Sequence, residues 1–355
     1  MESSLFGYPE KTNLNFSKMR LFSEFDSGNL ADANVSPTTD AFGRTIVEIF
    51  IARDCQGTPY VNSYATWFYF GVELFDPALK VCFNVMNCNN IKTLLSNGHH
   101  VVWKSREGSW QRLSEKCYNL KQKDSILQYS FDFDFEKELT KKSDLGSSRL
   151  TQSVLIGDGS VIMPEKSKRI FFFAFNYPWS YEDNCRWINS LASTTLSDGV
   201  SLVKSELCKS REKKEVALLT ISRGEITGKR NIVLSARIHP SETASSFALK
   251  GLVEALISQP KYYPLLDKFV FKIVPMMNPD GVYRGYTRSN SLGQNLNRFF
   301  INPSVEDQPE AYAFEKLVAG LAENHSVELC MDIHSNIKKD GVFLYGNSIE
   351  DFWVC

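Results

Sequence analysis

Two histidines and a glutamate in this chain have the types and the spacing of metal ligands. His239 follows the apolar run NIVLSARI and precedes Glu242 by three residues, and His334 follows a second apolar run, SVELCMDI. Catalytic zinc is held by three protein ligands, mainly imidazoles and carboxylates, with one position left open for water. These three residues could form one zinc site. An isolated His-x-x-Glu pair also occurs by chance, and Glu242 could instead stabilise the first turn of a helix.

A second group of polar residues lies between the two histidines, in RSNSLGQNLNRFF (288–300). Asn297 and Arg298 place an amide beside a guanidinium, which suits the capture of a carboxylate by paired hydrogen bonds. Arg288 supplies another cation in the same stretch. Alone, these residues would be ordinary solvated surface. Between two metal-binding strands we interpret them as a substrate anchor and a stabiliser of developing negative charge.

The elements that must position these residues are strands and helices in alternation, from residue 179 onward. Apolar strands are expected at 215–222, 231–238, 326–335 and 268–281, the last ending in a Pro-Asp-Gly turn, and helices are expected at 180–194, after Glu242 and at 310–324. This alternation predicts an α/β domain with a mixed, mostly parallel core sheet flanked by helices. Ligands in such sheets bind beyond the carboxyl ends of the strands, where both histidines lie.

Residues 1–178 show a different pattern. Short β-branched or aromatic runs, such as RTIVEIFIA (44–52) and RIFFFAFNYP (169–178), are separated by polar turns, and YSFDFDFE (129–136) alternates between apolar and polar residues. Such a pattern is typical of an antiparallel β-sandwich. We therefore predict a β-sandwich domain at 1–178 and an α/β domain at 179–355.

The composition excludes several classes of protein. A formal net charge of -1 provides no global field for nucleic acid or a membrane surface. No apolar run approaches the ~20 residues that span a bilayer. The eight cysteines are scattered, and the first residues do not resemble a signal peptide. We expect a soluble intracellular protein with free thiols, no nucleic-acid partner and no membrane insertion.

Several ordered motifs resemble those of the M14 zinc carboxypeptidases, and most of all the cytosolic carboxypeptidases, which are tubulin deglutamylases. In the α/β part these are HPSE (239–242), NPDGVYRGYTRSNSLGQNLNR (278–298) and MDIHSNIKKDGVFLYGN (331–347). The sandwich part agrees through FSEFDSGNLADA (22–33), ATWFYFGV (65–72) and FFFAFNYPWSY (171–181). FDSGNL and YGNS resemble the 5-like branch of that subfamily most closely.

The resemblance implies one Zn²⁺ per chain, with His239, Glu242 and His334 as its ligands. Asn295 stands where many relatives have an aspartate that contacts the first zinc histidine. An asparagine can still orient an imidazole by accepting its N–H, but it raises the basicity of the ring less than a carboxylate would.

The resemblance also implies a substrate. Asn297 and Arg298 match the pair that grips the terminal carboxylate, and Arg288 matches the arginine that polarises the scissile carbonyl and stabilises the oxyanion. The implied activity removes C-terminal or branch-point glutamates from polyglutamylated proteins, tubulin above all. The expected partners are tubulin, microtubules or other glutamylated proteins. We expect a cytoplasmic monomer, associated with microtubules or cilia and also present in the nucleus.

One part of the family mechanism finds no match in this sequence. Relatives carry a glutamate general base well downstream of the third ligand, whereas this chain ends at Cys355, 21 residues after His334. Glu350 and Asp351 stand in no matching motif. We therefore expect a C-terminally truncated α/β domain that lacks the general-base glutamate. Because a general base contributes roughly 10²–10⁴-fold, this form is expected to be weakly active or inactive.

Two other functions remain open. A zinc amidohydrolase that deacylates small N-acyl amino acids shares the same ligand and Asn-Arg pattern, but such enzymes have no long sandwich module in front. The other alternative is a non-catalytic protein that binds acidic tubulin tails. Testing a glutamate-tailed peptide and an N-acyl amino acid as substrates distinguishes a carboxypeptidase from the amidohydrolase. Zinc content together with co-sedimentation with polyglutamylated microtubules, without turnover, would support the binding protein.

Overall fold

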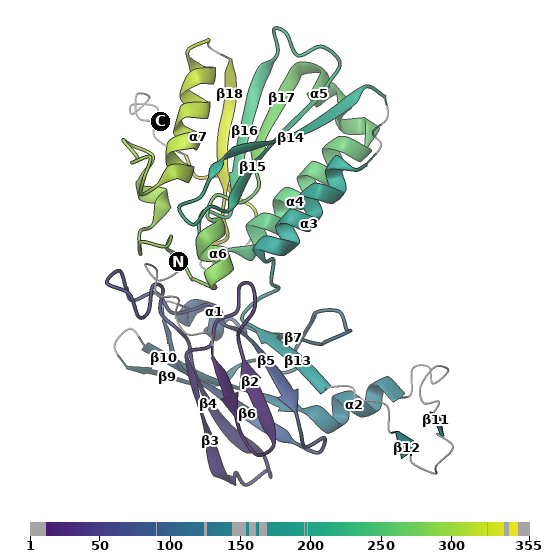
Figure 1. Cartoon of the computed structure of the whole chain (residues 1–355), viewed down its shortest axis with the longest axis vertical. Coiled ribbons are helices and arrows are strands. Elements are labelled where there is room, and N and C mark those ends of the chain that lie inside the picture. The colour runs from purple at the N-terminus through teal and green to yellow at the C-terminus, as the bar shows by residue number, and fades with distance from the viewer. Residues whose placement is uncertain are drawn as a thin grey trace. The chain divides into compact units, whose positions relative to one another are not determined.

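The computed structural model describes residues 12–89, 91–123, 126–143, 154–155, 161–162, 169–194, 196, 198–324, 326–336 and 341–346. They form two compact units (Figure 1). The sandwich unit comprises Glu10–Ala52 and Thr66–Asn176, and the α/β unit comprises Arg53–Ala65 and Tyr177–Cys355. Residues 53–65 thus group with the α/β unit, although in sequence they lie within the predicted first domain.

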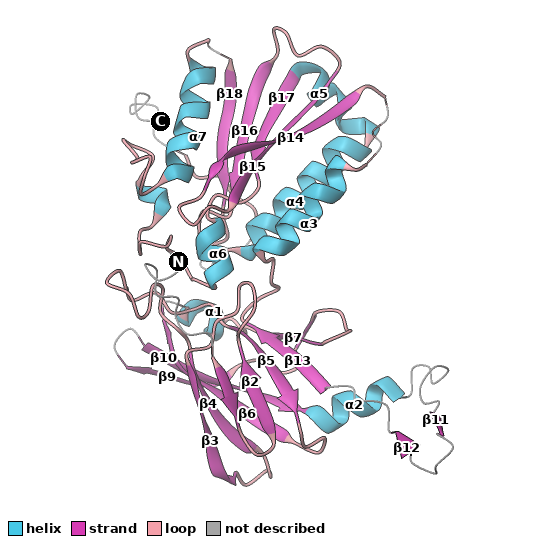
Figure 2. Cartoon of the chain, in the orientation of Figure 1, coloured by secondary structure: helices cyan, strands magenta, loops and turns pink. Residues whose placement is uncertain are grey.

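The sandwich unit contains two large sheets, whose strands Figure 2 shows in magenta. One sheet has the order β1 (Asn13–Asn15), β2 (Met19–Phe22), β5 (Tyr69–Leu74), β13 (Arg169–Ala174), β7 (Val102–Ser105) and β8 (Gln111–Arg112). The other has the order β3 (Asp32–Thr39), β4 (Thr45–Phe50), β6 (Lys80–Asn89), β10 (Ile126–Asp134) and β9 (Tyr118–Lys123). These pairings are antiparallel except for β4 with β6, which is parallel. Further elements are α1 (Lys92–Ser96), α2 (Phe135–Ser143), β11 (Val154–Leu155) and β12 (Val161–Ile162).

The core of the sandwich unit is aromatic. In β10 the side chains of Phe131 and Phe133 are buried, while the aspartates between and after them face outward and are partly exposed. The ring of Phe131 stacks on Phe83 of β6 at 5.1 Å between centroids, and Phe70 of β5 stacks on Phe173 of β13 at 5.6 Å. Alternation along a strand buries one face and leaves the other wet, so the predicted sandwich is confirmed.

The sheet of the α/β unit is mixed, as predicted. Its order is β14 (Val200–Lys209), β15 (Glu215–Arg223), β17 (Phe269–Val274), β16 (Arg230–Ala236) and β18 (Val327–Ile333). The β14–β15 and β15–β17 pairs are antiparallel, and the β17–β16 and β16–β18 pairs are parallel. The parallel half is therefore the part that carries both histidines at its carboxyl edge.

Helices cover both faces of this sheet (Figure 1). On one face α3 (Tyr181–Ala192), α4 (Thr243–Ser258) and α5 (Tyr263–Lys268) bury side chains such as Ile188, Leu249 and Leu266 against Leu219 and Leu234. On the other face α7 (Pro309–Ala322) packs Phe314 against Val216 and Val233. Neighbouring residues of one strand thus enter different cores, which explains why β15 and β16 read as continuous apolar runs. Short 3-10 helices occur at η1 (Pro260–Tyr262) and η2 (Leu296–Arg298).

The segment after β17 differs from the sequence-based expectation. The strand ends at Val274, and Pro279-Asp280-Gly281 begins the short helix α6 (Pro279–Arg284) instead of forming an isolated turn. The side chain of Asn278 accepts a hydrogen bond from the Gly281 N–H at 3.0 Å, and a proline occupies the first helical position. An asparagine cap followed by proline favours a helix start, and this explains the difference.

No helix among the described residues is both long and apolar enough to cross a membrane.

Candidate metal centre

The three predicted ligands come together at the carboxyl edge of the parallel strands. His239 lies three residues beyond β16, and His334 directly follows β18. One ligand atom from each of His239, Glu242 and His334 lies within 4.8 Å of the others. The Glu242 carboxylate bridges the two rings, because Oε1 lies 2.8 Å from Nδ1 of His239 and Oε2 lies 2.9 Å from Nδ1 of His334. Two imidazoles and a carboxylate at this separation form a zinc-type donor set.

The outer nitrogen of each imidazole is held by a polar partner. Nε2 of His239 lies 3.0 Å from Oδ1 of Asn295, and Nε2 of His334 lies 2.6 Å from Oδ2 of Asp332. With a cation bound in place of the protons shared with Glu242, a proton on Nε2 would leave Nδ1 unprotonated and available as a ligand. Metal-binding histidines in proteins are oriented in this way, so the residues present fit a divalent cation.

The electrostatics of the cluster also fit a cation. Burial raises the pKa of Glu242, but hydrogen bonds with His239 and His334 outweigh it and lower the pKa to about 2. Burial lowers the pKa of His334, whereas Asp332 and Glu242 raise it to about 10. Without a metal, the cluster thus binds a proton between two carboxylates. A divalent cation can take the place of that positive charge.

The alternative role of Glu242 as a helix-stabilising residue can be compared with its observed contacts. Glu242 is the residue immediately before α4, but its side chain makes no capping hydrogen bond to that helix. Its carboxylate accepts instead from the backbone N–H of Ser335 at 2.9 Å, in addition to its contacts with the two imidazoles. The orientation of the side chain therefore favours the ligand interpretation.

A buried arginine holds the loop that carries His239 and Glu242. Arg237 is 1% exposed and has a positive φ of 60°, which turns the chain sharply after β16. Its Nε donates to the Pro240 carbonyl at 2.7 Å, and its Nη1 donates to the Trp179 carbonyl at 2.9 Å and to Ser246 Oγ at 3.0 Å. Left-handed backbone is costly for a residue with a side chain, and these hydrogen bonds offset that cost.

The segment that contains Arg288 is hydrogen-bonded to the same loop. The Ser241 N–H donates to the Thr287 carbonyl at 3.1 Å. The amide nitrogen of Asn278 donates both to the Ile238 carbonyl at 3.2 Å and to the Ser289 carbonyl at 3.1 Å. The backbone on either side of Arg288 is therefore tied to the residues that flank His239, and the Arg288 side chain is partly buried.

Asn297 and Arg298 are connected to the metal centre through Asn295. Oδ1 of Asn295 faces His239 and also accepts the Asn297 N–H at 3.1 Å, which starts the 3-10 turn η2. Nη1 of Arg298 donates to the Asn297 carbonyl at 3.1 Å, and the Arg298 side chain is exposed. Asn295 therefore links the predicted carboxylate anchor to the imidazole of His239, because its side-chain oxygen contacts both.

Three residues of this network were not singled out from the sequence. Asp332 could have been identified from its position two residues before His334 in the same predicted strand. Arg237 could have been identified as a charged residue within the apolar run VLSARI. Asn278 begins the motif NPDGVYRGYTRSNSLGQNLNR, in which the sequence gives it no role of its own. Arg237 and Asn278 act through hydrogen bonds to Trp179 and Ile238, 58 and 40 positions away in the sequence, whereas Asp332 contacts His334 locally. Glu350 and Asp351 lie outside the described residues.

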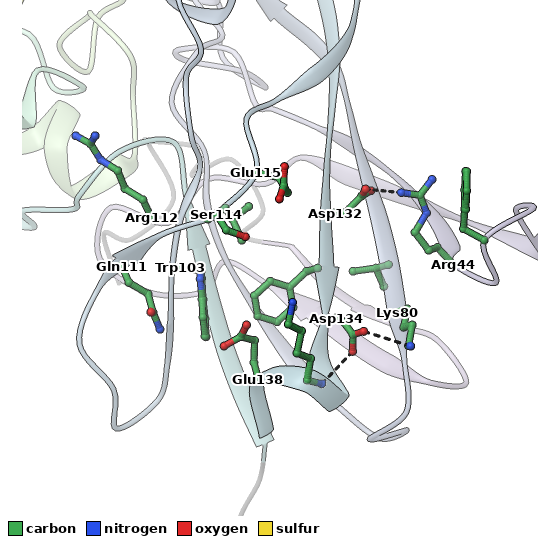
Figure 3. Close-up of a pocket in the computed structure, with 15 residues that line it drawn as sticks. Arg44, Lys80, Trp103, Gln111, Arg112, Ser114, Glu115, Asp132, Asp134 and Glu138 are labelled. Atoms are coloured by element: carbon green, nitrogen blue, oxygen red, sulfur yellow. Dashed lines mark hydrogen bonds and ion pairs between the residues drawn. The ribbon is translucent and has the colours of Figure 1, made fainter. Parts of the chain in front are cut away.

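The sandwich unit has a cavity of its own, which is not the candidate site. It measures about 400 Å³, and none of the predicted site residues lines it. Figure 3 shows Asp132 directed at Arg44 and Asp134 directed at Lys80, and both are ion pairs. Opposite charges that neutralise each other leave little net field for a charged ligand.

Comparison with known proteins places the α/β unit in a class. Residues 186–339 match the zinc carboxypeptidase family, peptidase M14. Within this matched range, His239, Glu242 and His334 form a donor set that could hold one Zn²⁺.

The chain is similar to several cytosolic carboxypeptidases. It is 29% identical to cytosolic carboxypeptidase 6 of Mus musculus, over 97% of this chain and 57% of the relative. It is 30% identical to cytosolic carboxypeptidase 1 of Homo sapiens, over 94% of this chain and 26% of the relative. Cytosolic carboxypeptidase-like protein 5 of Mus musculus is 28% identical over 82% of this chain and 36% of the relative. The chain thus spans less than two thirds of these relatives, and the identities do not separate the three branches.

Solved structures support the fold. A metallo-carboxypeptidase from Burkholderia cenocepacia superposes with a TM-score of 0.67 at 21% identity, covering 90% of this chain and 71% of that structure. A metallo-carboxypeptidase from Pseudomonas aeruginosa superposes with a TM-score of 0.60 at 23% identity, covering 90% of this chain and 70% of that structure. The predicted zinc-carboxypeptidase fold preceded by a sandwich is therefore confirmed.

Proposed function

We propose that this chain is part of a zinc-dependent metallocarboxypeptidase that hydrolyses the last peptide bond of proteins ending in glutamate. The observation that carries the proposal is the arrangement of His239, Glu242 and His334, whose ligand atoms lie within 4.8 Å of one another. Hydrogen bonds link this cluster to the Asn297–Arg298 pair and to the segment of Arg288. A metal centre beside a carboxylate anchor is the minimum that a carboxypeptidase requires.

Each residue has a separate task in this proposal. Asn297 and Arg298 bind the terminal carboxylate of the substrate by paired hydrogen bonds. Arg288 donates to the scissile carbonyl oxygen and stabilises the negative charge that develops on it. Asn295 and Asp332 keep the two imidazoles in the tautomer that presents Nδ1. The chemistry that zinc supplies in such sites is Lewis-acid polarisation of a carbonyl and activation of water.

The proposed substrates are C-terminal or branch-point glutamates of polyglutamylated proteins, with tubulin as the main partner. Support comes from the similarity to proteins named cytosolic carboxypeptidases and from two cations, Arg288 and Arg298, on the segment beside the metal centre. The names of these relatives also support a cytoplasmic location, with microtubule, ciliary or nuclear association following the substrate. We propose that the protein acts as a monomer.

The first test is whether the 355-residue chain binds zinc. We expect one zinc per chain by elemental analysis, and loss of that zinc in His239→Ala and His334→Ala. His100→Ala is the matched control, because Nδ1 of His100 contacts the Leu113 carbonyl within the sandwich unit. Zinc that stays in both ligand variants, or none in the native chain, would contradict the proposal.

Substrate class is tested with three peptides of equal length. A peptide with a free C-terminal glutamate should bind the zinc-loaded chain more tightly than its C-terminal amide or a lysine-ended peptide. Arg298→Ala should weaken binding of the free acid and leave the amide unchanged. Equal binding of all three peptides would overturn the proposed substrate class.

Turnover is measured separately, because no general base has been assigned within this chain. Release of glutamate from the same peptide, abolished by a chelator, would support catalysis directly. Zinc-dependent binding to glutamylated microtubules without release would favour the non-catalytic alternative.

A further inference from the structure

A buried carboxylate from the first third of the chain lies against the segment of Arg288. Asp54 belongs to residues 53–65, the loop between β4 and β5 that groups with the α/β unit, and its side chain is fully buried. Oδ1 accepts the Thr287 N–H at 2.6 Å, and Oδ2 accepts the N–H groups of Arg288 and Ser289, both at 2.8 Å. One carboxylate therefore binds three consecutive backbone donors, with Arg288 in the middle.

The rest of the loop follows the same segment closely. The ring of Tyr64 lies beneath the guanidinium of Arg288, with 5.9 Å between the guanidinium carbon and the ring centroid. The side chain of Asn62 donates to Ser289 Oγ at 2.8 Å and to the Gly293 carbonyl at 3.2 Å. Gly293 has a φ of 70°, and a Cβ there would lie 2.2 Å from the Tyr60 carbonyl oxygen, so only glycine permits this approach.

The opposite side of the Arg288 segment is bound to the metal-ligand loop. The Thr287 carbonyl accepts from Ser241, and the Ser289 carbonyl accepts from Asn278. The N–H groups of residues 287–289 thus point to Asp54, while the Thr287 carbonyl faces the loop of His239 and the Ser289 carbonyl faces Asn278, which also donates to the Ile238 carbonyl. Both sides of the peptide chain are fixed, and the origin of the Arg288 side chain is fixed with them.

We propose that Asp54 is a positioning residue that aims Arg288 at the reacting carbonyl through these three backbone hydrogen bonds. The proposal rests on the role given to Arg288 under the proposed function. A donor contributes to catalysis only if it is already in place when charge develops, and a displacement of about 1 Å can cost as much as 10²-fold. Asp54 does not touch the substrate in this scheme and acts only through Arg288.

The test uses the zinc-loaded 355-residue chain and two ligands measured by calorimetry. One is a glutamate-ended peptide whose last peptide bond is replaced by a tetrahedral phosphinic group, which requires Arg288 for its charged oxygens. The other is free glutamate, which requires only the carboxylate anchor. We expect Asp54→Asn to lower the affinity for the phosphinic peptide about tenfold. The affinity for glutamate and the zinc content should stay unchanged.

A double-mutant comparison separates positioning from general stability. Asp54→Asn should have no further effect on the affinity for the phosphinic peptide when Arg288→Ala is already present. Asp280→Asn is the matched control, because Asp280 is also buried and accepts Ser210 Oγ at 2.6 Å and the Glu212 N–H at 2.9 Å, away from Arg288. The control should lower stability and keep the affinity for the phosphinic peptide.

A second measurement does not depend on ligand. The amides of residues 287–289 should exchange with deuterium faster in Asp54→Asn than in the native chain, since their acceptor is weakened. Should Asp54→Asn fail to fold, Asn62→Ala removes the side-chain hydrogen bonds to Ser289 and Gly293. That variant should lower the affinity for the phosphinic peptide about threefold, as expected for the loss of neutral hydrogen bonds.

The outcomes separate this inference from the proposed function. If Arg288→Ala keeps full affinity for the phosphinic peptide, the role of Arg288 fails and the inference falls with it. If Arg288→Ala loses affinity but Asp54→Asn does not, the inference alone is overturned. An equal loss in Asp280→Asn, or an additive effect of Asp54→Asn and Arg288→Ala, would also overturn it, because both indicate a merely structural role.

Discussion

Oε2 of Glu242 lies 2.9 Å from Nδ1 of His334, although the two residues are 92 positions apart in the sequence. Glu242 immediately precedes α4 and His334 directly follows β18, and the parallel pairing of β16 with β18 brings these two positions together. Because His239 and Glu242 lie in the loop after β16 and His334 follows β18, a bound metal would cross-link these two segments.

Metal removal should therefore destabilise the α/β unit. A ligand that binds only the folded state stabilises it by about 2.7 kcal/mol when its free concentration is 100 times Kd. We expect the unfolding temperature to fall on treatment with a chelator and to recover with Zn²⁺. The His334→Ala variant should show no such response, and a response of native size in that variant would contradict the ligand assignment.

The stability of the metal-free protein should depend on pH through His334. Its pKa in the folded state is raised from 6.5 to about 10 by Asp332 and Glu242, so the folded state binds the proton more tightly than the unfolded state. The resulting stabilisation is complete below pH 6.5 and is lost as the pH rises toward 10. Denaturant titrations of chelator-treated protein between pH 6 and pH 9 measure this loss, and His334→Gln should remove it.

Zinc binding should release protons at neutral pH for the same reason, since imidazole must lose its proton to become a ligand. Calorimetric titration with Zn²⁺ in two buffers of different ionisation enthalpy gives the number released. A value close to one at pH 7 is expected, and zero would show that His334 does not exchange its proton for the metal.

Asn295 should tune the metal affinity through His239. Substitution of such an outer partner typically costs 10–100-fold in metal affinity, so Asn295→Leu is expected to weaken zinc binding within about that range. Asn295→Asp places a carboxylate on Nε2 and should strengthen binding, because it increases the basicity of the ring. Competition with a chromogenic chelator measures both variants. Equal affinities for Asn295→Leu, Asn295→Asp and the native chain would exclude a direct influence on His239.

Arg237 should be a major contributor to the stability of the loop between β16 and α4. Hydrogen bonds to charged groups contribute roughly 1.5–3 kcal/mol, and Arg237→Met would leave the carbonyls of Trp179 and Pro240 buried without this donor. We expect a loss of about 3 kcal/mol in the free energy of unfolding, measured by denaturant titration. Arg186→Met is the control, since its ion pairs with Glu182 and Asp183 are exposed and should contribute less than about 1 kcal/mol.

The sequence by itself determined the two kinds of architecture and the identity of the three metal-binding candidates. Periodicity is a local property, so the alternation around Phe131 and the apolar runs before His239 and His334 could be recognised without a structure. The His-x-x-Glu spacing is local too, and the position of parallel strand ends follows a general rule.

Only the tertiary structure decided which nitrogen of each histidine faces Glu242 and which partners hold the outer nitrogens. It also decided that Asp54 belongs with the Arg288 segment, more than 230 positions away in the sequence. A lone aspartate in a polar loop has no periodic or motif signal. Its partners are backbone N–H groups, which every residue except proline carries, so their pairing emerges only when the folded chain brings the two segments together.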